Sequence, residues 1–362
     1  MQVFPWLFLS LLAQPVAVPA VSDGPYLQLQ PNQSAVTARW VCDDKIHQQQ
    51  LTTDQLVPAV CGFQQPIRID TRPPAGWQFH SARFAAISDI HGQYDLMLRL
   101  LQAGGIVDAK HNWSFGRNHL VVVGDVMDRG DKVTQALWLL YTLQQQARQA
   151  GGALHLLPGN HETMVLRGDL RYVHPQYLKV AGQLKTPLPA LYGKDTVLGQ
   201  LLRQLPLFIR INDTLFVHGG LSPQMASRAE TAEQLQAGFQ QSWGLTKDQL
   251  RQTDLPQLLQ RSEGPLWYRG YFRANNKAPF DPQLLRQQLA EFGAKQIVVG
   301  HTSMDDVYLH HNGLVYSVDS SIKDGKSGAV LHFVDGQWFR SGLDGSLKPV
   351  LAAPAAPHKN EL

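Results

Sequence analysis

The sequence has few cysteines and few charged residues, and beyond its N-terminus it has no long hydrophobic run. Two cysteines among 362 residues exclude a disulfide-rich scaffold and a zinc module built on CxxC pairs. Charged residues make up only 17% of the chain, and the net charge of +3 comes without any block of like charge. We therefore expect no nucleic-acid partner, because such proteins carry a basic stripe. No apolar run after the N-terminus reaches the roughly 18 residues of a membrane span, so we expect no stable membrane insertion.

The first 20 residues contain no charged side chain. Residues 3–12 are apolar and residues 18–20 end in alanine, a small residue that signal peptidases favour. We therefore predict a signal peptide over residues 1–20 and an exported, periplasmic or secreted protein. A buried N-terminal strand is the alternative, because the basic residue that usually precedes the apolar segment is missing. Cys42 and Cys61 could form a disulfide in an oxidising compartment, although two buried free thiols also fit the sequence.

The rest of the chain divides into a lead-in, one large domain and a tail. Hydrophobic residues make up 44% of the chain, which is enough to bury a sizeable core. Residues 21–82 alternate and are punctuated by prolines, so they predict a β-rich lead-in. From 83 to 340, short β runs are followed by helical periodicity, and this predicts an α/β fold with a parallel sheet. Residues 341–362 are rich in alanine and proline and predict a flexible tail.

Within the large domain, the strands and helices are expected as follows. Strands are predicted at 83–88, 119–124 and 153–158, with helices near 94–102 and 132–149 between them; a hairpin is predicted over 207–218, and later strands at 296–300, 314–318, 328–334 and 337–339. The mostly helical segments 163–204 and 223–292 are interpreted as insertions around the mouth of a site.

Polar clusters stand where the predicted strands end. They read SDIHG from residue 88, GDVMDRG from 124, GNHE from 159, VHGG from 217 and GHT from 300. One strand-helix-strand interval separates Asp89 from Asp125, and another separates Asp125 from Asn160. The first three clusters should therefore meet at the carboxyl edge of one sheet, where open α/β sheets place their ligands.

The residue types in these clusters are those of a metal site. Asp89 and His91 are two residues apart on a segment that we expect to be extended, so both side chains should leave from one face. Oxygen and imidazole donors without thiolate suit Mn, Fe, Zn or Mg. The donors exceed the needs of one ion, whereas two ions bridged by a carboxylate would use them all. Taken singly, each aspartate could instead cap a helix or form a turn, and His218 or His301 could be an ordinary core histidine.

Together these motifs resemble the calcineurin-like metallophosphoesterase superfamily, in its phosphoprotein-phosphatase branch. That branch has the pattern GD-x-HG, GD-xx-DRG, GNHE, HGG and a late GH, and one departure here is Ser88 in place of glycine. The segment PLWYRGY over residues 265–271 makes the chain most similar to the Shewanella-like protein phosphatases. The resemblance covers residues 83–320 and implies a metallophosphoesterase-type β-sandwich core with β-α-β-α-β units and flanking helices.

The resemblance also implies a role for each motif residue. Two divalent metal ions would be held by Asp89, His91, Asp125, Asn160, His218 and His301, with Asp125 bridging. His161 would be the general acid and Asp128 the carboxylate that orients it. Arg129 and Arg269 would bind the substrate phosphate, since arginine offers a planar fork to two oxygens. A hydroxide between the metals would attack the phosphorus directly, in line with the leaving group.

The substrate is expected to be a phosphoprotein or phosphopeptide, hydrolysed by a monomer with a preference for phosphotyrosine. Aromatic residues flank the phosphate-binding positions and could form a slot for a phenol ring, although they could equally be core. These aromatic residues are Tyr172, Tyr177, Trp267, Tyr268, Tyr271 and Phe272. No CxxxxxR motif is present, which excludes a cysteine-nucleophile phosphatase. The alternatives are a dinucleoside polyphosphate hydrolase and a non-catalytic phosphate- or peptide-binding module.

Overall fold

The computed structural model describes residues 20–31, 34–61, 63, 65–70, 72–73, 76–228, 230–272 and 280–354. The predicted signal peptide therefore lies outside the described residues except for Ala20, and so does the end of the predicted tail. Across the described part of the chain, no helix is both long and apolar enough to cross a membrane.

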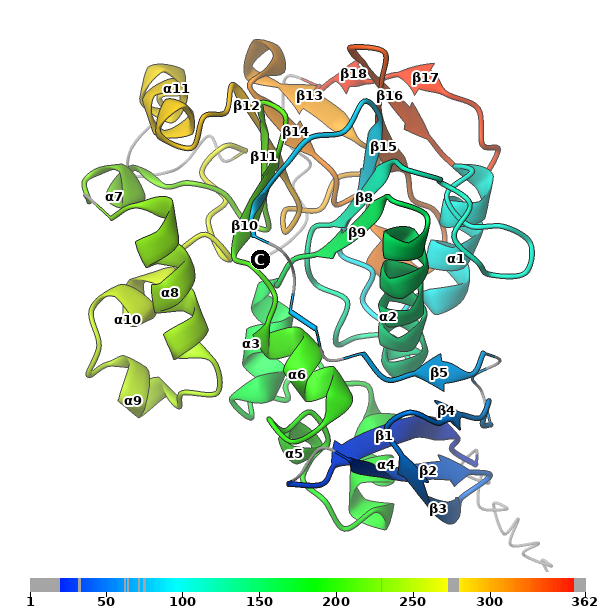
Figure 1. Ribbon diagram of the computed structural model, residues 1–362. Coiled ribbons are helices and arrows are strands. Elements are labelled where there is room, and N and C mark those ends of the chain that lie inside the picture. The colour runs from blue at the N-terminus through cyan, green and yellow to red at the C-terminus, as the bar shows by residue number, and fades with distance from the viewer. Residues whose placement is uncertain are drawn as a thin grey trace, which may run out of the picture.

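Two β-sheets form the centre of the molecule, and helices lie on their outer sides (Figure 1). The six-stranded sheet has the order β17-β16-β15-β7-β8-β9 and consists of β7 (Phe84–Ile87), β8 (His119–Val122), β9 (Ala153–Leu156), β15 (Val330–Val334), β16 (Gln337–Ser341) and β17 (Lys348–Pro349). The seven-stranded sheet has the order β18-β13-β14-β12-β11-β10-β6 and consists of β6 (Gln78–Phe79), β10 (Phe208–Ile211), β11 (Thr214–Val217), β12 (Gln296–Val299), β13 (Tyr308–His310), β14 (Val315–Ser317) and β18 (Leu351–Ala352). The predicted α/β fold with a sandwich core is confirmed.

Helices follow the strands of the first sheet and fill both predicted insertions. They are α1 (Tyr94–Ala103), α2 (Val133–Gln149), α3 (Asn160–Leu166), α4 (Pro175–Gln183), α5 (Leu188–Leu191), α6 (Val197–Arg203), α7 (Pro223–Ala226), α8 (Ala232–Ser242), α9 (Lys247–Leu250), α10 (Leu255–Leu259) and α11 (Pro282–Glu291), with two short 3-10 turns, η1 (His311–Gly313) and η2 (Ile322–Asp324). β7, β8 and β9 pair in parallel as predicted, whereas β15 joins β7 in the antiparallel direction.

The strands that lead to the polar clusters are apolar on both faces because both faces are covered. On β7, Phe84 and Ala86 join an apolar cluster that includes residues from both sheets, while Ala85 and Ile87 join the cluster that includes α1 and α2. Phe84 meets Phe216 of β11 edge to face, with ring centroids 5.8 Å apart. Burial of side chains of this size stabilises a fold by about 1.5–3 kcal/mol each. The loops at the ends of these strands therefore start from a rigid base.

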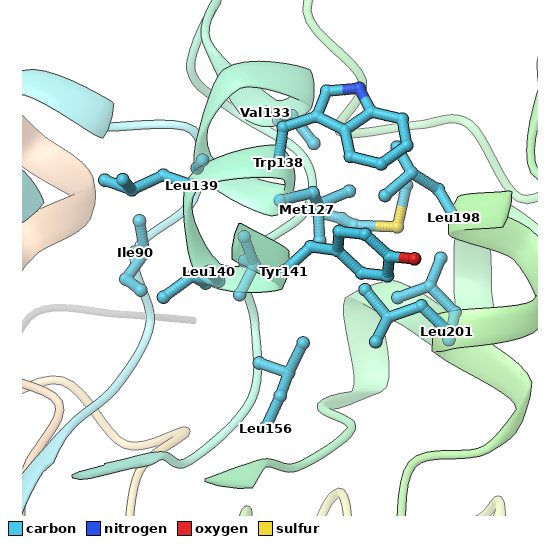
Figure 2. Packing of buried hydrophobic residues seen from close by; sticks show 14 of the residues in the cluster. Ile90, Met127, Val133, Trp138, Leu139, Leu140, Tyr141, Leu156, Leu198 and Leu201 are labelled. Carbon is cyan, nitrogen blue, oxygen red and sulfur yellow. The ribbon is translucent and has the colours of Figure 1, made fainter. Parts of the chain in front are cut away.

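Helix α2 anchors one of the polar loops. Its Trp138 and Tyr141 lie toward Leu198 of α6, and Met127, which belongs to the GDVMDRG cluster, packs among them (Figure 2). Met127 is 2% exposed and Trp138 is fully buried. Burial of the Met127 side chain therefore holds the backbone on which Asp128 sits.

The lead-in is built from strands, and it shares its core with the large domain. It comprises β1 (Asp23–Leu29), β2 (Ala35–Cys42), β3 (Lys45–Thr52), β4 (Leu56–Val57) and β5 (Ile67–Arg68). The Trp138 indole N–H donates to the Pro25 carbonyl over 3.0 Å. Cys42 and Cys61 are joined by a disulfide, with their Cα atoms 5.6 Å apart, so of the two alternatives the disulfide is the one found.

The first half of the predicted flexible tail is ordered. Residues 348–349 form β17, which pairs with β16, and residues 351–352 form β18, which pairs with β13. The alanine- and proline-rich composition suggested fraying, but composition does not reveal that each sheet has a free edge to which this segment can pair. The sequence also did not predict β13, a short strand with partly exposed side chains.

Candidate active site and metal centre

The five polar clusters meet at one place. Three of them follow β7, β8 and β9 of one sheet, and two follow β11 and β12 of the other, which also run parallel. Main-chain hydrogen bonds tie the loops together: the Asp89 N–H donates to the Gly124 carbonyl over 3.1 Å, and the Gly300 N–H donates to the His218 carbonyl over 2.8 Å. Residues that are far apart in sequence are thus held at one edge of the sandwich.

Asp125 lies at the centre of the cluster. Its Oδ2 atom is 3.2 Å from His218 Nε2, 3.6 Å from His91 Nε2 and 3.9 Å from His161 Nε2. Its Oδ1 atom accepts a hydrogen bond of 2.9 Å from the His161 main chain, at the N-terminus of α3. Asp125 is 2% exposed. A buried carboxylate with imidazole nitrogens on several sides has the position of a bridging ligand.

The other predicted ligands surround it. Asn160 Oδ1 is 3.1 Å from His218 Nε2, and Asp89 Oδ1 is 3.9 Å from His91 Nε2. The His301 N–H donates to Asp89 Oδ2 over 2.9 Å. The structure therefore brings all six predicted metal-binding residues together.

The donor atoms form two overlapping groups that could each hold a cation. One group is His91, Asp125 and His161, the other is Asp125, His218 and His301, and within each group the donor atoms lie within 4.8 Å of one another. Both groups are buried and contain only carboxylate and imidazole donors, which suits first-row divalent ions. The residues present thus fit a pair of divalent metals that share Asp125.

The backbone of the site differs from the expectation. Asp89 and His91 were expected on an extended segment, but their φ angles are +53° and +47°. Four more of the predicted site residues share this left-handed conformation, namely Asp125, Asp128, Arg129 and His301. Such backbone is strained for residues other than glycine, and it is typical of functional sites that the surrounding structure holds in place. Turns, and not a strand face, therefore aim these side chains at the centre.

Two glycines are required by close contacts between the loops. A Cβ atom on Gly159 would lie 2.0 Å from Asp125 Oδ1, and one on Gly300 would lie 2.1 Å from Ser88 Oγ and 2.5 Å from Asp89 Oδ2. All three distances are too short for a Cβ atom. These glycines thus let the backbone approach the Asp125 and Asp89 carboxylates.

His161 and Asp128 form a buried pair beside the cluster. His161 Nδ1 is 2.6 Å from Asp128 Oδ2, which leaves Nε2 directed toward Asp125. Burial lowers the pKa of His161, but the charges of Asp125 and Asp128 outweigh it and the pKa is raised. This geometry fixes the ring and presents one nitrogen to the centre, which suits a proton donor.

Both predicted phosphate-binding arginines lie near the cluster. Arg269 Nη1 donates to the His301 carbonyl over 2.5 Å. Arg129 is exposed, and its guanidinium lies over the ring of Tyr172, 5.3 Å from the centroid. Because it is exposed, Arg129 can reach a bound anion. Arg269 is in addition bonded to the main chain of the cluster.

The electrostatics of the site favour positive charge near Asp125. Burial raises the pKa of Asp125, but His218, His161 and His91 outweigh it and hold the pKa well below its usual range. Burial lowers the pKa of His218, but Asp125 and Asp89 reverse this and raise it to about 9. For His91 burial prevails and lowers the pKa to about 3. Asp125 and Asp89 together stabilise the positive charge of His218, so the same carboxylates can stabilise bound cations.

Two buried carboxylates received no role in the sequence analysis. Glu162 accepts hydrogen bonds from the main-chain N–H groups of Gly159, Asp125, Val126 and Met127, at 2.6–3.0 Å. The signal for it was its place three residues after Gly159, where helix-capping glutamates stand. Asp319 accepts from the Ser303 hydroxyl at 2.7 Å, and burial together with the charge of Asp89 raises its pKa well above the usual range. Nothing local in the sequence marked Asp319.

The expected aromatic slot is mostly core. Tyr177, Tyr268, Tyr271 and Phe272 are each at most 9% exposed and belong to the apolar clusters. Tyr172 remains exposed, and Trp267 is partly exposed. Aromatic residues alternate between core and surface according to how their segment packs, and the sequence does not show that packing.

Comparisons with known proteins agree with this geometry. The chain matches the calcineurin-like phosphoesterase family over residues 82–305. It is similar to the crystal structure of a cold-active protein-tyrosine phosphatase of a psychrophile, Shewanella sp., with a TM-score of 0.86 and 39% identity over 91% of this chain and 99% of that one.

Curated relatives give the same picture over shorter regions. Shewanella-like protein phosphatase 1 of Plasmodium berghei is 27% identical over 230 residues, which is 61% of each chain. Shewanella-like protein phosphatase 2 of Arabidopsis thaliana is 38% identical over 91 residues, which is 25% of this chain and 23% of the relative. The chain thus spans less than two thirds of the length of these curated relatives. The resemblance inferred from the motifs is confirmed.

Proposed function

Because the chain belongs to the calcineurin-like phosphoesterase family, we propose that it is a protein phosphatase with a preference for phosphotyrosine. The protein is a hydrolase of phosphate esters that uses two divalent metal ions. The convergence of the two donor groups on Asp125, with the His161–Asp128 pair beside them, carries the proposal of catalysis. The similarity to the tyrosine phosphatase of Shewanella over 91% of the chain supports the choice of substrate.

We propose the following distribution of ligands. Asp89, His91 and Asp125 would hold one metal, and Asp125, Asn160, His218 and His301 would hold the other. When bound, such ions neutralise charge on the phosphate and lower the pKa of water to about 7. A donor nitrogen of His161 also lies within 4.8 Å of the His91 and Asp125 donors. Its Nε2 is, however, the farthest from Asp125 of the three imidazole nitrogens around that carboxylate.

His161 is proposed as the general acid. Asp128 binds Nδ1 and stabilises the doubly protonated ring, so the Nε2 proton can pass to the leaving oxygen. Arg129 can bind phosphate oxygens through its planar fork, and Arg269 supports the His301 loop and can add a second contact. Both cysteines are in the disulfide, so neither is a nucleophile. We propose that water attacks the phosphorus directly, without a phosphoenzyme.

We propose that the enzyme is exported and acts in the periplasm or outside the cell. The Cys42–Cys61 disulfide supports this location, because such bonds persist in oxidising compartments. The substrates would then be phosphoproteins or phosphopeptides of that compartment.

A substrate panel on metal-defined enzyme tests the proposal. Metal-free protein is reconstituted with Mn, Fe, Zn or Mg and given a phosphotyrosine peptide, the matched phosphoserine peptide and diadenosine tetraphosphate. The phosphotyrosine peptide should have the highest kcat/KM, and an Asp125→Asn variant should be inactive on all three. Faster cleavage of the dinucleotide would favour the polyphosphate hydrolase, and no turnover with any metal would favour the binding module. A phosphoenzyme trapped by acid quench would refute direct attack.

A further inference from the structure

Tyr172 stands beside the proposed general acid with its ring open to solvent. It lies between α3 and α4, is 44% exposed, and its ring centroid is 5.2 Å from that of His161 at an interplanar angle of 54°. Its carbonyl accepts a hydrogen bond of 2.8 Å from the Arg129 N–H. An exposed aromatic ring is therefore fixed to the loop that carries Asp128.

Two cations support this ring. The guanidinium groups of Arg129 and Arg171 lie 5.3 Å and 5.6 Å from its centroid. Arg171 is held in turn by Asp169, through contacts of 2.8 Å and 2.9 Å. Cations at these distances attract the ring face and limit the motion of an exposed side chain. The ring is thus held by contacts within the enzyme itself.

The place of this ring matches the place of the leaving group. A general acid must lie within hydrogen-bond reach of the leaving oxygen, so the carbon attached to that oxygen lies close to His161. In phosphotyrosine that carbon belongs to a phenyl ring, whereas in phosphoserine it is a single methylene. Of the other candidate rings, Tyr177 and Tyr271 are buried, and the partly exposed Trp267 lies beside His301, with ring centroids 5.9 Å apart. Tyr172 is therefore positioned to contact a phenyl leaving group and has little to contact in phosphoserine.

We propose that Tyr172, backed by Arg129 and Arg171, is the specificity-determining residue that recognises the phenyl ring of phosphotyrosine. This inference rests on the proposed function and names the side chain that produces its preference. An aromatic pair of this kind changes affinity by up to about tenfold.

The test measures the selectivity ratio, which is kcat/KM for a phosphotyrosine peptide divided by kcat/KM for the matched phosphoserine peptide. Tyr172→Ala and Tyr172→Leu should each lower the ratio by about two- to tenfold, mainly through KM for the phosphotyrosine peptide. Tyr172→Phe keeps the ring and should keep the ratio. Leu178→Ala is the matched control, because Leu178 is 47% exposed on α4 of the same insertion. This variant should leave kcat/KM unchanged for both peptides. Thermal melting of each variant checks the fold.

The outcomes separate the two proposals. If the parent enzyme prefers phosphotyrosine and Tyr172→Ala keeps the parent ratio, the role of Tyr172 is refuted while the proposed function stands. If Tyr172→Phe loses selectivity as Tyr172→Ala does, the ring is not what recognises the substrate. If the parent enzyme shows no preference for phosphotyrosine, the substrate proposal and this inference both fail.

Discussion

Replacement of Glu162 by glutamine should weaken both the fold and the metal site. The Glu162 side chain is 1% exposed and accepts four main-chain hydrogen bonds, from Gly159, Asp125, Val126 and Met127. All four partners are donors, so only a carboxylate can accept from every one of them. Glutamine turns one of the two acceptor atoms into a donor that faces other donors.

The size of the effect follows from the two lost contacts. Oε1 accepts from Val126 and Met127, and Oε2 accepts from Asp125 and Gly159, so an amide nitrogen at either position removes two bonds. Hydrogen bonds to charged groups are worth about 1.5–3 kcal/mol each. Burial and the charge of Asp125 raise the pKa of Glu162, so a neutral amide also removes an unfavourable interaction. Glu162→Gln should therefore lower the free energy of unfolding by at most about 3–6 kcal/mol. The melting temperature should fall on the order of 10 °C. Because the hydrogen bonds to Glu162 hold the Asp125 backbone in place, their loss should lower metal affinity about 10- to 100-fold.

Differential scanning fluorimetry of the metal-free protein and calorimetric titration with Mn²⁺ measure the two effects. Glu291→Gln is the matched control, because Glu291 is exposed at the end of α11, and it should change neither quantity. The reasoning is refuted if Glu162→Gln melts and binds metal as Glu291→Gln does. A variant that melts early but binds metal normally would show that Glu162 stabilises the fold without positioning Asp125.

Three further predictions concern the general acid, the lead-in and the disulfide. His161→Ala should keep its metals in elemental analysis but lose at least about 100-fold in kcat on an alkyl phosphate. The loss should be smaller on p-nitrophenyl phosphate, because its leaving group needs no acid. Equal losses on the two substrates would show that His161 is not the general acid. Burial raises the pKa of Asp23 to about 6, so the stability from its protonated form is present below about pH 4 and is lost as the pH rises to about 6. Asp23→Asn should therefore be more stable than the parent at pH 7, by up to about 3 kcal/mol, with the gap closing near pH 4 in urea unfolding; a gap independent of pH would contradict this. The Cys42–Cys61 bond links residues 19 apart, so a Cys42→Ser/Cys61→Ser variant should lose about 3 kcal/mol in free energy of unfolding. A variant as stable as the parent in urea unfolding would contradict this prediction.

Much of the fold followed from local patterns in the sequence. The strand before Asp89 and the helix over 133–149 are close to where the periodicity predicted them, because alternation and 3.6-residue spacing are imposed by the layers that cover each element. The order of the polar clusters also sufficed to identify the family, since each cluster ends a strand and the strands reach one edge.

The remaining features depend on contacts between distant parts of the chain. Composition did not predict β17 and β18, because pairing to a free sheet edge is a property of the partner strand as well. It did not separate Tyr172, which is exposed beside His161, from Tyr177, which is buried, since both are tyrosines in one insertion.

The sequence by itself determined which residues can bind metal and phosphate and in what order they occur, because residue chemistry and spacing are local properties. Only the tertiary structure decided how they are aimed. His91 points to Asp125 and Asp89 lies beside His91, both on left-handed turns. Those turns persist because neighbouring loops accept and donate their main-chain hydrogen bonds. Glu162 acquires its role for the same reason, since its four partners are assembled only when β8, β9 and α3 come together.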